Sequence, residues 1–338
     1  MSQRSLSRML IVVAVVAVAA VIAVVMDNRE GPGDGERLLL PALTAGINDA
    51  ARVTLTEAGE TVVLSRQDNQ WGVDDKSSYA ADIGQLRELL IQLSRLEIIE
   101  AKTAKPENYK KLGVQDVSKD SGNRRITVVD AADVVLADVI IGQRKGGVRV
   151  SHYVRRADEA ASWLVRGDIR RTQGMESWLD KVLLNLPAND IVSVQLNHAR
   201  NSDQIRLERD EKAKPVLANL PKGKTLKSEP ELNRLFGALS NLRIDDVFPQ
   251  SEFSFDQGKQ VISRYTTKDG WVVNATVQKS DDRYYMKISA SQNGGGDGEN
   301  AGAVPGLMAM NSRAAGRVFI IPTATGELLS RSISALLE

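Results

Sequence analysis

The residues able to carry out acid–base or nucleophilic chemistry are few and scattered in this chain. Its 338 residues include no cysteine and two histidines, His152 and His198. Without cysteine the chain has no thiol nucleophile, disulfide, zinc ribbon or iron–sulfur site. His152 stands in an alternating, strand-like stretch and His198 in the turn-like stretch NHARNSD, and no G-x-S-x-G motif offers an exposed serine. We interpret both histidines as surface or half-buried residues without a catalytic role.

Three pairs of adjacent acids are the next candidates for catalysis or cation binding. They are Asp74–Asp75, Asp245–Asp246 and Asp281–Asp282. Glycoside hydrolysis needs two carboxylates about 5–10 Å apart across a cleft, whereas neighbours in a strand point to opposite faces. Each pair falls where a turn is expected, so we interpret all three as solvated turn residues.

Two glycine-containing stretches have the composition of phosphate-binding loops without the required spacing. The segment LPKGKT at 220–225 has Ala218 where a P-loop requires its first glycine. The segment GQRKGG at 142–147 has no helix after it and is typical of a hairpin loop. The sequence therefore predicts no catalytic, cofactor-binding or metal-ligating residue, and no cofactor.

The overall charge argues against nucleic acid as a partner. Lys and Arg number 44, Asp and Glu number 43, and the net charge is +1. A nucleic-acid-binding domain usually carries a clear excess of basic residues. Hydrophobic residues make up 42% of the chain, which is ordinary for a globular protein with a sizeable core.

An uninterrupted apolar run near the N-terminus predicts a membrane anchor. Residues 9–26 read MLIVVAVVAVAAVIAVVM, and Arg4 and Arg8 precede them. A helix of about 20 apolar residues spans a bilayer, and basic flanks stay on the cytoplasmic side. A cleaved signal peptide is the main alternative, although VVMD is a poor cleavage site; a buried soluble helix is the third. We expect a cytoplasmic tail at 1–8, an uncleaved anchor at 9–26 and a linker at 27–46.

Two similar stretches, LSRLEI at 93–98 and LSNLRI at 239–244, indicate an internal duplication. The upstream segments NDAARVTL at 48–55 and NDIVSVQL at 189–196 also correspond. Apolar residues before and within each LS motif follow the i, i+3, i+4, i+7 spacing of one helix face. They are Leu86, Leu89, Leu90, Leu93 and Leu96 in the first copy and Leu232, Leu235, Phe236, Leu239 and Leu242 in the second, an offset of 146.

The local signals around these helices complete the predicted unit. Asp82 with Gln85, and Ser228 with Glu231, have the spacing of a helix N-cap and its third-position partner. Alternating β-branched stretches follow each helix and predict strands. Apolar segments at 175–186 and 324–337 predict a closing helix for each unit.

The predicted fold class is therefore α+β. An N-terminal transmembrane helix is followed by two tandem duplicated units at 47–187 and 188–338. Each unit is expected to hold an antiparallel sheet with a long packed helix and a closing helix. We interpret the clustered aromatic residues as core anchors, with a ligand groove or protein contact as the alternative; they are Trp71, Tyr79, Tyr109, Trp271, Tyr284 and Tyr285.

Several segments resemble a bacterial family of unknown function. They are the apolar run, LLLPAL with IND at 38–49, QW at 70–71, YAAD with LRELL at 79–90, and KTAKPENYKKLGV at 102–114. Members are single-span envelope proteins of duplicated α+β make-up, commonly encoded beside ABC-type transport systems of the gliding-motility kind. The resemblance implies a single-pass protein of the bacterial inner membrane, with its N-terminus cytoplasmic and most of its chain periplasmic. It brings no established catalytic residues.

The function expected from the sequence is that of a non-enzymatic, membrane-anchored periplasmic accessory or scaffold protein of an ABC-type transport complex. Its expected partners are the membrane, through residues 9–26, and integral membrane or ABC transporter subunits. The alternative is a module that binds an envelope ligand, glycan or lipid, in a groove between the two units. An envelope hydrolase with an unrecognised site is the third possibility.

Overall fold

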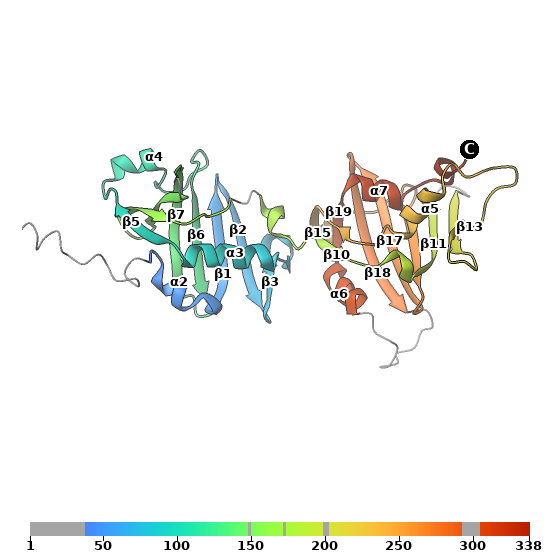
Figure 1. Ribbon diagram of the computed structural model, residues 1–338, viewed down its shortest axis with the longest axis horizontal. Coiled ribbons are helices and arrows are strands. Elements are labelled where there is room, and N and C mark those ends of the chain that lie inside the picture. The colour runs from blue at the N-terminus through green and yellow to red at the C-terminus, as the bar shows by residue number, and fades with distance from the viewer. Residues whose placement is uncertain (1–37, 148–149, 172–173, 199–202, 293–304) are drawn as a thin grey trace, which may run out of the picture.

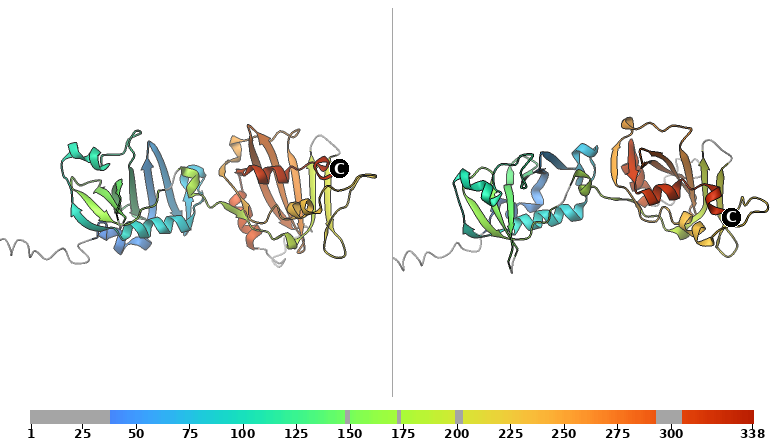
Figure 2. Two further views of the ribbon diagram at one scale, coloured as in Figure 1. Left: turned by 45° about the horizontal axis from the view of Figure 1, so that its top comes forward. Right: turned by 90° about the horizontal axis from the view of Figure 1, so that it is seen from above.

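Two antiparallel sheets joined by a short linker make up the protein. The computed structural model describes residues 38–147, 150–171, 174–198, 203–292 and 305–338. The sheets lie next to one another along the long axis of the molecule, and the chain passes once between them (Figures 1 and 2). We call residues 38–178 the first unit, Leu179–Leu184 the linker and residues 185–338 the second unit; the boundaries expected at 47–187 and 188–338 stay predictions.

The first unit is a nine-stranded sheet in the order β4-β3-β2-β1-β6-β7-β8-β9-β5. Helix α3 (Ile83–Ser94) runs along one face of it (Figure 1). The shorter helices are α2 (Pro41–Ala45), α4 (Tyr109–Leu112), η1 (Ile47–Asp49), η2 (Asp74–Lys76), η3 (Pro106–Asn108) and η4 (Met175–Trp178). The strands are β1 (Ala50–Glu57), β2 (Glu60–Gln67), β3 (Gln70–Val73), β4 (Tyr79–Ala80), β5 (Glu97–Ala101), β6 (Arg124–Asp130), β7 (Val135–Lys145), β8 (Ser151–Arg156) and β9 (Ser162–Arg166).

The second unit is an eight-stranded sheet in the order β13-β12-β11-β16-β17-β18-β19-β15. A separate two-stranded ribbon pairs β10 (Val182–Leu184) of the linker with β14 (Leu242–Arg243). The helices are α5 (Glu229–Phe236), α6 (Pro305–Ala314), α7 (Thr323–Leu329), η5 (Ala188–Asp190), η6 (Gln250–Glu252) and η7 (Ile333–Leu336). The strands of the sheet are β11 (Ile191–His198), β12 (Gln204–Arg209), β13 (Pro215–Leu217), β15 (Asp246–Pro249), β16 (Val261–Thr267), β17 (Trp271–Ser280), β18 (Arg283–Gln292) and β19 (Arg317–Ile321).

The two sheets have the same strand order once the edge strand β4 is set aside. The first sheet then has the order β3-β2-β1-β6-β7-β8-β9-β5, and the second has β13-β12-β11-β16-β17-β18-β19-β15. At every position the two strands are equivalent in chain order, so β1 corresponds to β11, β2 to β12 and so on. Even an irregularity is shared. The ladder β1–β6 shifts register between Ala50 and Arg52, and β11–β16 shifts between Ile191 and Ser193. Because bulges bend a strand at a defined place, the two sheets bend at equivalent positions.

The leucine face drives helix packing in both units. Leu86, Leu89, Leu90 and Leu93 of α3 are buried, and Asp82 accepts a hydrogen bond from the Gln85 N–H at 3.0 Å. This confirms the predicted burial and the predicted N-cap of the first helix. The last apolar position behaves differently: Leu96 is buried but lies after the helix has ended at Ser94, just before β5.

The predicted fold class is wrong in several of its helical parts. Strands make up 42% and helices 24% of the described structure. Segment 175–186, expected to be a closing helix, forms η4 and then the strand β10, because its apolar residues pair with β14 instead of coiling locally. Segment 324–337 divides between α7 and η7, and α5 has only 8 residues.

The transmembrane element of that prediction is contradicted as well. Within the described ranges, no helix is long and apolar enough to cross a membrane. Residues 9–26, to which the anchor was assigned, lie outside the described residues, as do 1–8 and all but the last part of 27–46. The predicted single-pass inner-membrane location is contradicted by the same finding, and we assign the chain no location.

Candidate functional site at the joint between the two units

Consecutive residues of the linker are hydrogen-bonded to different units. The Asp180 N–H donates to the Ala80 carbonyl of β4 at 2.8 Å, while the Lys181 carbonyl accepts from the Ile244 N–H at 2.9 Å. Val182 then pairs with Arg243 in the β10–β14 ribbon. A linker whose backbone groups are paired on both sides loses the torsional freedom of an ordinary connecting loop.

Arg313 fastens the linker to the second unit. It lies in the last turn of α6, which packs against β18 and β10. Its Nη1 donates to Asp180 Oδ2 at 3.0 Å and to the Val182 carbonyl at 2.9 Å, and its Nη2 donates to the Leu183 carbonyl at 2.7 Å. Hydrogen bonds from a charged donor are among the stronger ones in proteins, so a single side chain holds three successive parts of the linker.

Arg317, at the start of β19, bonds both units with one guanidinium. Its Nη1 donates to the Arg313 carbonyl at 3.1 Å, one of the carbonyls that helix α6 leaves unpaired at its C-terminus. A cation at this end of a helix is favoured by the helix dipole. The Nη2 donates to the Ser77 carbonyl of the first unit at 2.6 Å.

A second ion pair crosses the joint. Lys76 of η2 lies 2.7 Å from Asp246 of β15, and the two side chains are 14% and 16% exposed. Lys76 also lies over the Phe248 ring, 5.6 Å from its centroid. Limited exposure means limited screening, so loss of either partner would leave an uncompensated charge in a poorly solvated place.

Tyr79 of β4 is the apolar anchor of the joint. Its side chain is 1% exposed and meets Phe319 of β19 edge-on, with ring centroids 5.9 Å apart. Burial, the largest influence, raises the pKa of Tyr79 to about 12, so the hydroxyl is neutral at ordinary pH. Its Oη is buried and has no hydrogen-bond partner among the described residues.

Gly72 lets β3 approach the segment that carries Tyr79. A Cβ at Gly72 would come within 2.8 Å of the Ser78 carbonyl oxygen, closer than real Cβ atoms lie. Any side chain here would push β3 and β4 apart, although Gly72 pairs with Ala80 and Val73 with Tyr79 in this ladder. The glycine therefore sets the position of Tyr79 against the second unit.

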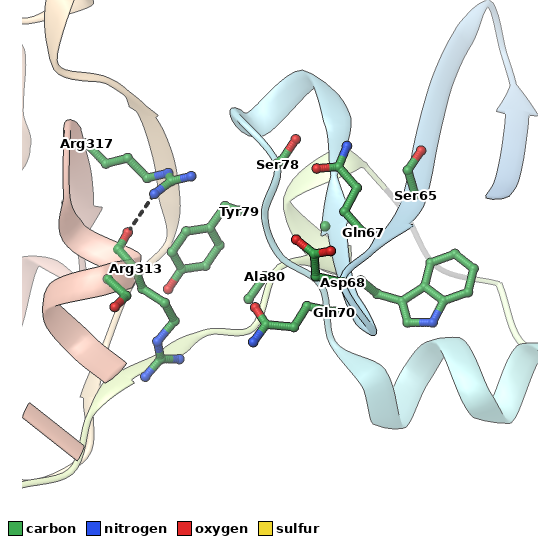
Figure 3. A pocket seen from close by; sticks show the side chains of 12 residues that line it. Ser65, Gln67, Asp68, Gln70, Ser78, Tyr79, Ala80, Arg313 and Arg317 are labelled. Carbon is green, nitrogen blue, oxygen red and sulfur yellow. Dashed lines mark hydrogen bonds between the residues drawn. The ribbon is translucent and has the colours of Figure 1, made fainter. Parts of the chain in front are cut away.

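A small polar pocket of about 250 Å³ opens at this joint (Figure 3). In Figure 3, Gln67, Asp68 and Gln70 project from the first unit on one side, and Arg313 and Arg317 lie on the other. The residues lining it are Ser65, Gln67, Asp68, Gln70, Trp71, Gly72, Ser78, Tyr79, Ala80, Ser312, Arg313 and Arg317.

The chemistry available to this pocket is that of holding and positioning. The terminal guanidinium nitrogens of both arginines are engaged by carbonyl and carboxylate oxygens of the protein. Their Nε atoms are buried and have no hydrogen-bond partner in the described structure. Among the lining residues, Asp68 is the one carboxylate and none is a histidine.

The histidines and acidic pairs that could carry chemistry lie in different parts of the structure. His198 Nε2 lies 3.0 Å from the Arg331 carbonyl. His152 is buried in the first unit, so the surface or half-buried position expected for it is wrong. Asp281 and Asp282 occupy the β17–β18 turn with positive φ, as expected of turn residues. Asp246 differs, because it is the partially buried partner of Lys76 and no solvated turn residue. Across the described ranges, no group of three or more His, Cys, Asp or Glu residues is placed to hold a metal ion.

Sequence reasoning missed the residues that build the joint. Lys76 and Asp246 are separated by 170 positions, and Arg313 and Asp180 by 133. No local pattern marks either pair. The i, i+4 spacing of Arg313 and Arg317 at the end of a helix was the available signal, because cations are favoured there.

Comparison with known proteins assigns the family. Residues 71–258, more than half of the chain, match the domain of unknown function DUF4340. The chain belongs to the DUF4340 family. The DUF4340 match begins in β3 and ends beyond η6, so it takes in Tyr79, the linker and Asp246 but not Arg313 or Arg317. No curated protein and no solved structure matches the chain.

Proposed function

We propose that this DUF4340 protein is a non-enzymatic accessory or scaffold protein of an ABC-type transport complex, whose two sheet units act as one stiff body. The observation that carries the proposal is the joint. Asp180 and Lys181, adjacent in the linker, bond to different units, and Arg313 and Arg317 close the contact from the second unit.

A stiff joint favours simultaneous binding by both units. When two surfaces are held at a fixed separation, the second contact forms within the same molecule and profits from a high effective concentration. No free energy is then spent on ordering a flexible hinge. The elongated arrangement in Figures 1 and 2 separates the outer ends of the two sheets, which suits a protein that bridges partners.

Exposed apolar side chains supply a contact for such a partner. Val134 and Val135, at the β6–β7 turn, are 57% and 54% exposed. These two neighbouring valines would offer a small apolar contact to a partner. The transport complex as the partner is supported by the resemblance of residues 47–114 to proteins encoded beside such systems, and membership of an uncharacterised family agrees with that resemblance.

Affinity purification of the tagged full-length chain from detergent extract tests the proposal. We expect integral subunits of an ABC-type transporter to be recovered with it. We also expect the double variant Val134→Ser and Val135→Ser to recover less, while Val216→Ser, at an exposed valine of β13, recovers as much as the parent chain. Recovery of no transporter subunit by the folded parent chain would reject the proposal.

Binding of a glycan or lipid in the groove at the joint is the second candidate function. The exposed amides of Gln67 and Gln70 and the half-buried indole of Trp71 favour it, since they offer hydrogen bonds beside an apolar ring. Binding of an oligosaccharide in calorimetry that is lost in Gln70→Ala would support this function. Equal binding by both chains would place that ligand elsewhere and argue against the groove.

A further inference from the structure

A larger cavity lies within the first unit, away from the joint. Its volume is about 810 Å³. It is formed where the start of β6, the far end of β7 and the start of β8 meet segment 168–171. The residues lining it are Gly122, Arg124, Ile141, Gly142, Gln143, Arg144, His152, Asp168, Ile169, Arg170 and Arg171.

His152 lines this cavity with both of its ring nitrogens unused. The side chain is 6% exposed, and neither Nδ1 nor Nε2 has a hydrogen-bond partner among the described residues. Buried polar groups in proteins are nearly always hydrogen-bonded. Neither nitrogen is hydrogen-bonded within the described structure or open to water, so the charge of this imidazole depends on the charges around it.

Arg124 places a buried cation beside the histidine. Its guanidinium is held by two carbonyls of segment 168–171, with Nη2 at 3.3 Å from the Ile169 oxygen and 2.8 Å from the Arg170 oxygen. Burial lowers the pKa of Arg124 to about 10, which leaves it charged at neutral pH. These carbonyls bond Nη2 alone and do not neutralise the charge. The nearby Glu57 carboxylate raises the pKa of Arg124 but is itself paired with Arg171, so a further anion is favoured.

A bulge between β7 and β8 aims Arg144 and His152 at the cavity. Ile141 pairs with Val154, and the next pairing joins Arg144 to His152, so the register shifts between them. Gly142 sits at this shift, where a Cβ would lie 2.4 Å from the Leu112 carbonyl oxygen. Bulges are common beside functional sites because they redirect side chains. The Arg144 side chain forms no hydrogen bond or ion pair with the described residues.

We propose that this cavity binds the phosphate group of a small organic phosphate, with Arg124 and Arg144 as its ligands and the buried imidazole of His152 beside them. Four arginines line the cavity against the single carboxylate of Asp168. A phosphate monoester carries a charge of about −1.5 to −2 at pH 7 and accepts bidentate hydrogen bonds from guanidinium groups. A carboxylate ligand would bring only one charge, and Asp168 already supplies one.

The size of the cavity indicates an organic part beyond the phosphate. The volume exceeds what one phosphate group fills, and the side chains of Ile141 and Ile169 add apolar lining. This site goes beyond the scaffold function proposed above and does not rest on it. The cavity lies at another part of the first unit, and none of its lining residues lines the pocket at the joint.

Titration of the histidine reports on the site. Burial is the main cause that lowers the pKa of His152, and Arg124 and Arg144 lower it further while Asp168 raises it. Arg170 and Arg171 also face the cavity, and they are paired with Glu88 and Glu57. A bound dianion favours imidazolium, so it should raise the titration midpoint of His152 by about one pH unit or more.

Nuclear magnetic resonance of the full-length chain, labelled only at histidine, tests the proposal. Two signals arise, and His198 in the second unit serves as an internal control. On addition of glycerol 3-phosphate we expect the His152 signal to move and its titration midpoint to rise, while His198 keeps both. An unmoved His152, or equal movement of both histidines, would overturn the proposal.

Two arginine variants separate the site from general charge attraction. Arg144→Ala removes a side chain without a partner, so folding is unaffected, and it should weaken glycerol 3-phosphate binding about tenfold or more, as loss of a hydrogen bond between charged groups does. Arg264→Ala removes an exposed arginine of β16 in the second unit and should leave binding within twofold. Equal weakening by both would contradict the proposed site.

A second pair of ligands identifies the source of the phosphate. Glycerol 3-phosphate and its dihexanoyl diester, a short-chain phosphatidic acid, present the same phosphate group. If glycerol 3-phosphate binds more tightly, the natural ligand is a water-soluble phosphate ester. If the dihexanoyl ester binds more tightly, the natural ligand is a lipid headgroup. Binding of acetate as tight as either would contradict the phosphate assignment.

Discussion

The hydroxyl of Tyr79 offers a sharp test of the joint, because its removal should stabilise the protein. The Tyr79→Phe variant keeps the ring that meets Phe319 edge-on at 5.9 Å. It deletes only an oxygen that is buried and has no hydrogen-bond partner in the described structure. That hydroxyl is a polar atom removed from water on folding without a compensating hydrogen bond.

The magnitude follows from the desolvation of that group. An unsatisfied buried donor or acceptor costs about 1–3 kcal/mol, so the free energy of unfolding should rise by about 1–2 kcal/mol. For a unit of this size that corresponds to an increase in melting temperature of about 2–8 °C. Tyr79→Ala should instead destabilise the protein by about 3–5 kcal/mol, because the aromatic contact is lost.

Urea titration and scanning calorimetry of the full-length variants provide the assay. Tyr265→Phe is the matched control, since Tyr265 is fully buried in the second sheet and its hydroxyl is likewise unpartnered. Both phenylalanine variants should gain stability. Destabilisation by Tyr79→Phe alone would refute the reasoning, since it would mean that the Tyr79 hydroxyl bonds a group of the folded protein.

Three further predictions concern the joint, its glycine and the buried histidine. Arg313→Ala should speed amide hydrogen exchange of the linker at least tenfold, because one ion pair and two carbonyl hydrogen bonds are lost; the exposed-arginine control Arg264→Ala should leave exchange unchanged. Gly72→Ala should lower the melting temperature through about 1–3 kcal/mol of overpacking, whereas Gly122→Ala, where a Cβ meets open space, should be tolerated. The His152 pKa lies below its usual value of 6.5, so the unfolded chain takes up the proton first; stability should be full above about pH 6.5 and fall below it, and urea midpoints of His152→Gln should lose that part of the pH dependence.

The sequence was informative where a residue's role depends on its near neighbours. The buried leucines of α3 and the Asp82 cap follow from spacing alone, because both depend on positions within two turns of one helix. The predicted cap of the second helix is wrong, because the Ser228 side chain makes no hydrogen bond to α5. The same capping motif therefore has different outcomes in two helices, and sequence spacing could not distinguish them.

The remaining structure depends on pairing between distant segments. Segment 175–186 has the composition of a short apolar helix, but β14, some 60 residues later, offers it a strand partner. The joint is likewise built from side chains more than 100 positions apart. Tertiary contacts of this kind override local propensity, which is why neither β10 nor the Lys76–Asp246 pair was predicted.

The most direct test of the central claim is the distance between the two units in solution. The chain has no cysteine, so cysteines introduced at Lys105 and Lys212, exposed residues of the first and second units, can be spin-labelled without background. Double electron–electron resonance should give one narrow distance distribution for the parent chain and a broad one for the double variant Arg313→Ala and Arg317→Ala. A broad distribution in the parent chain, unchanged by those substitutions, would contradict a stiff two-unit scaffold.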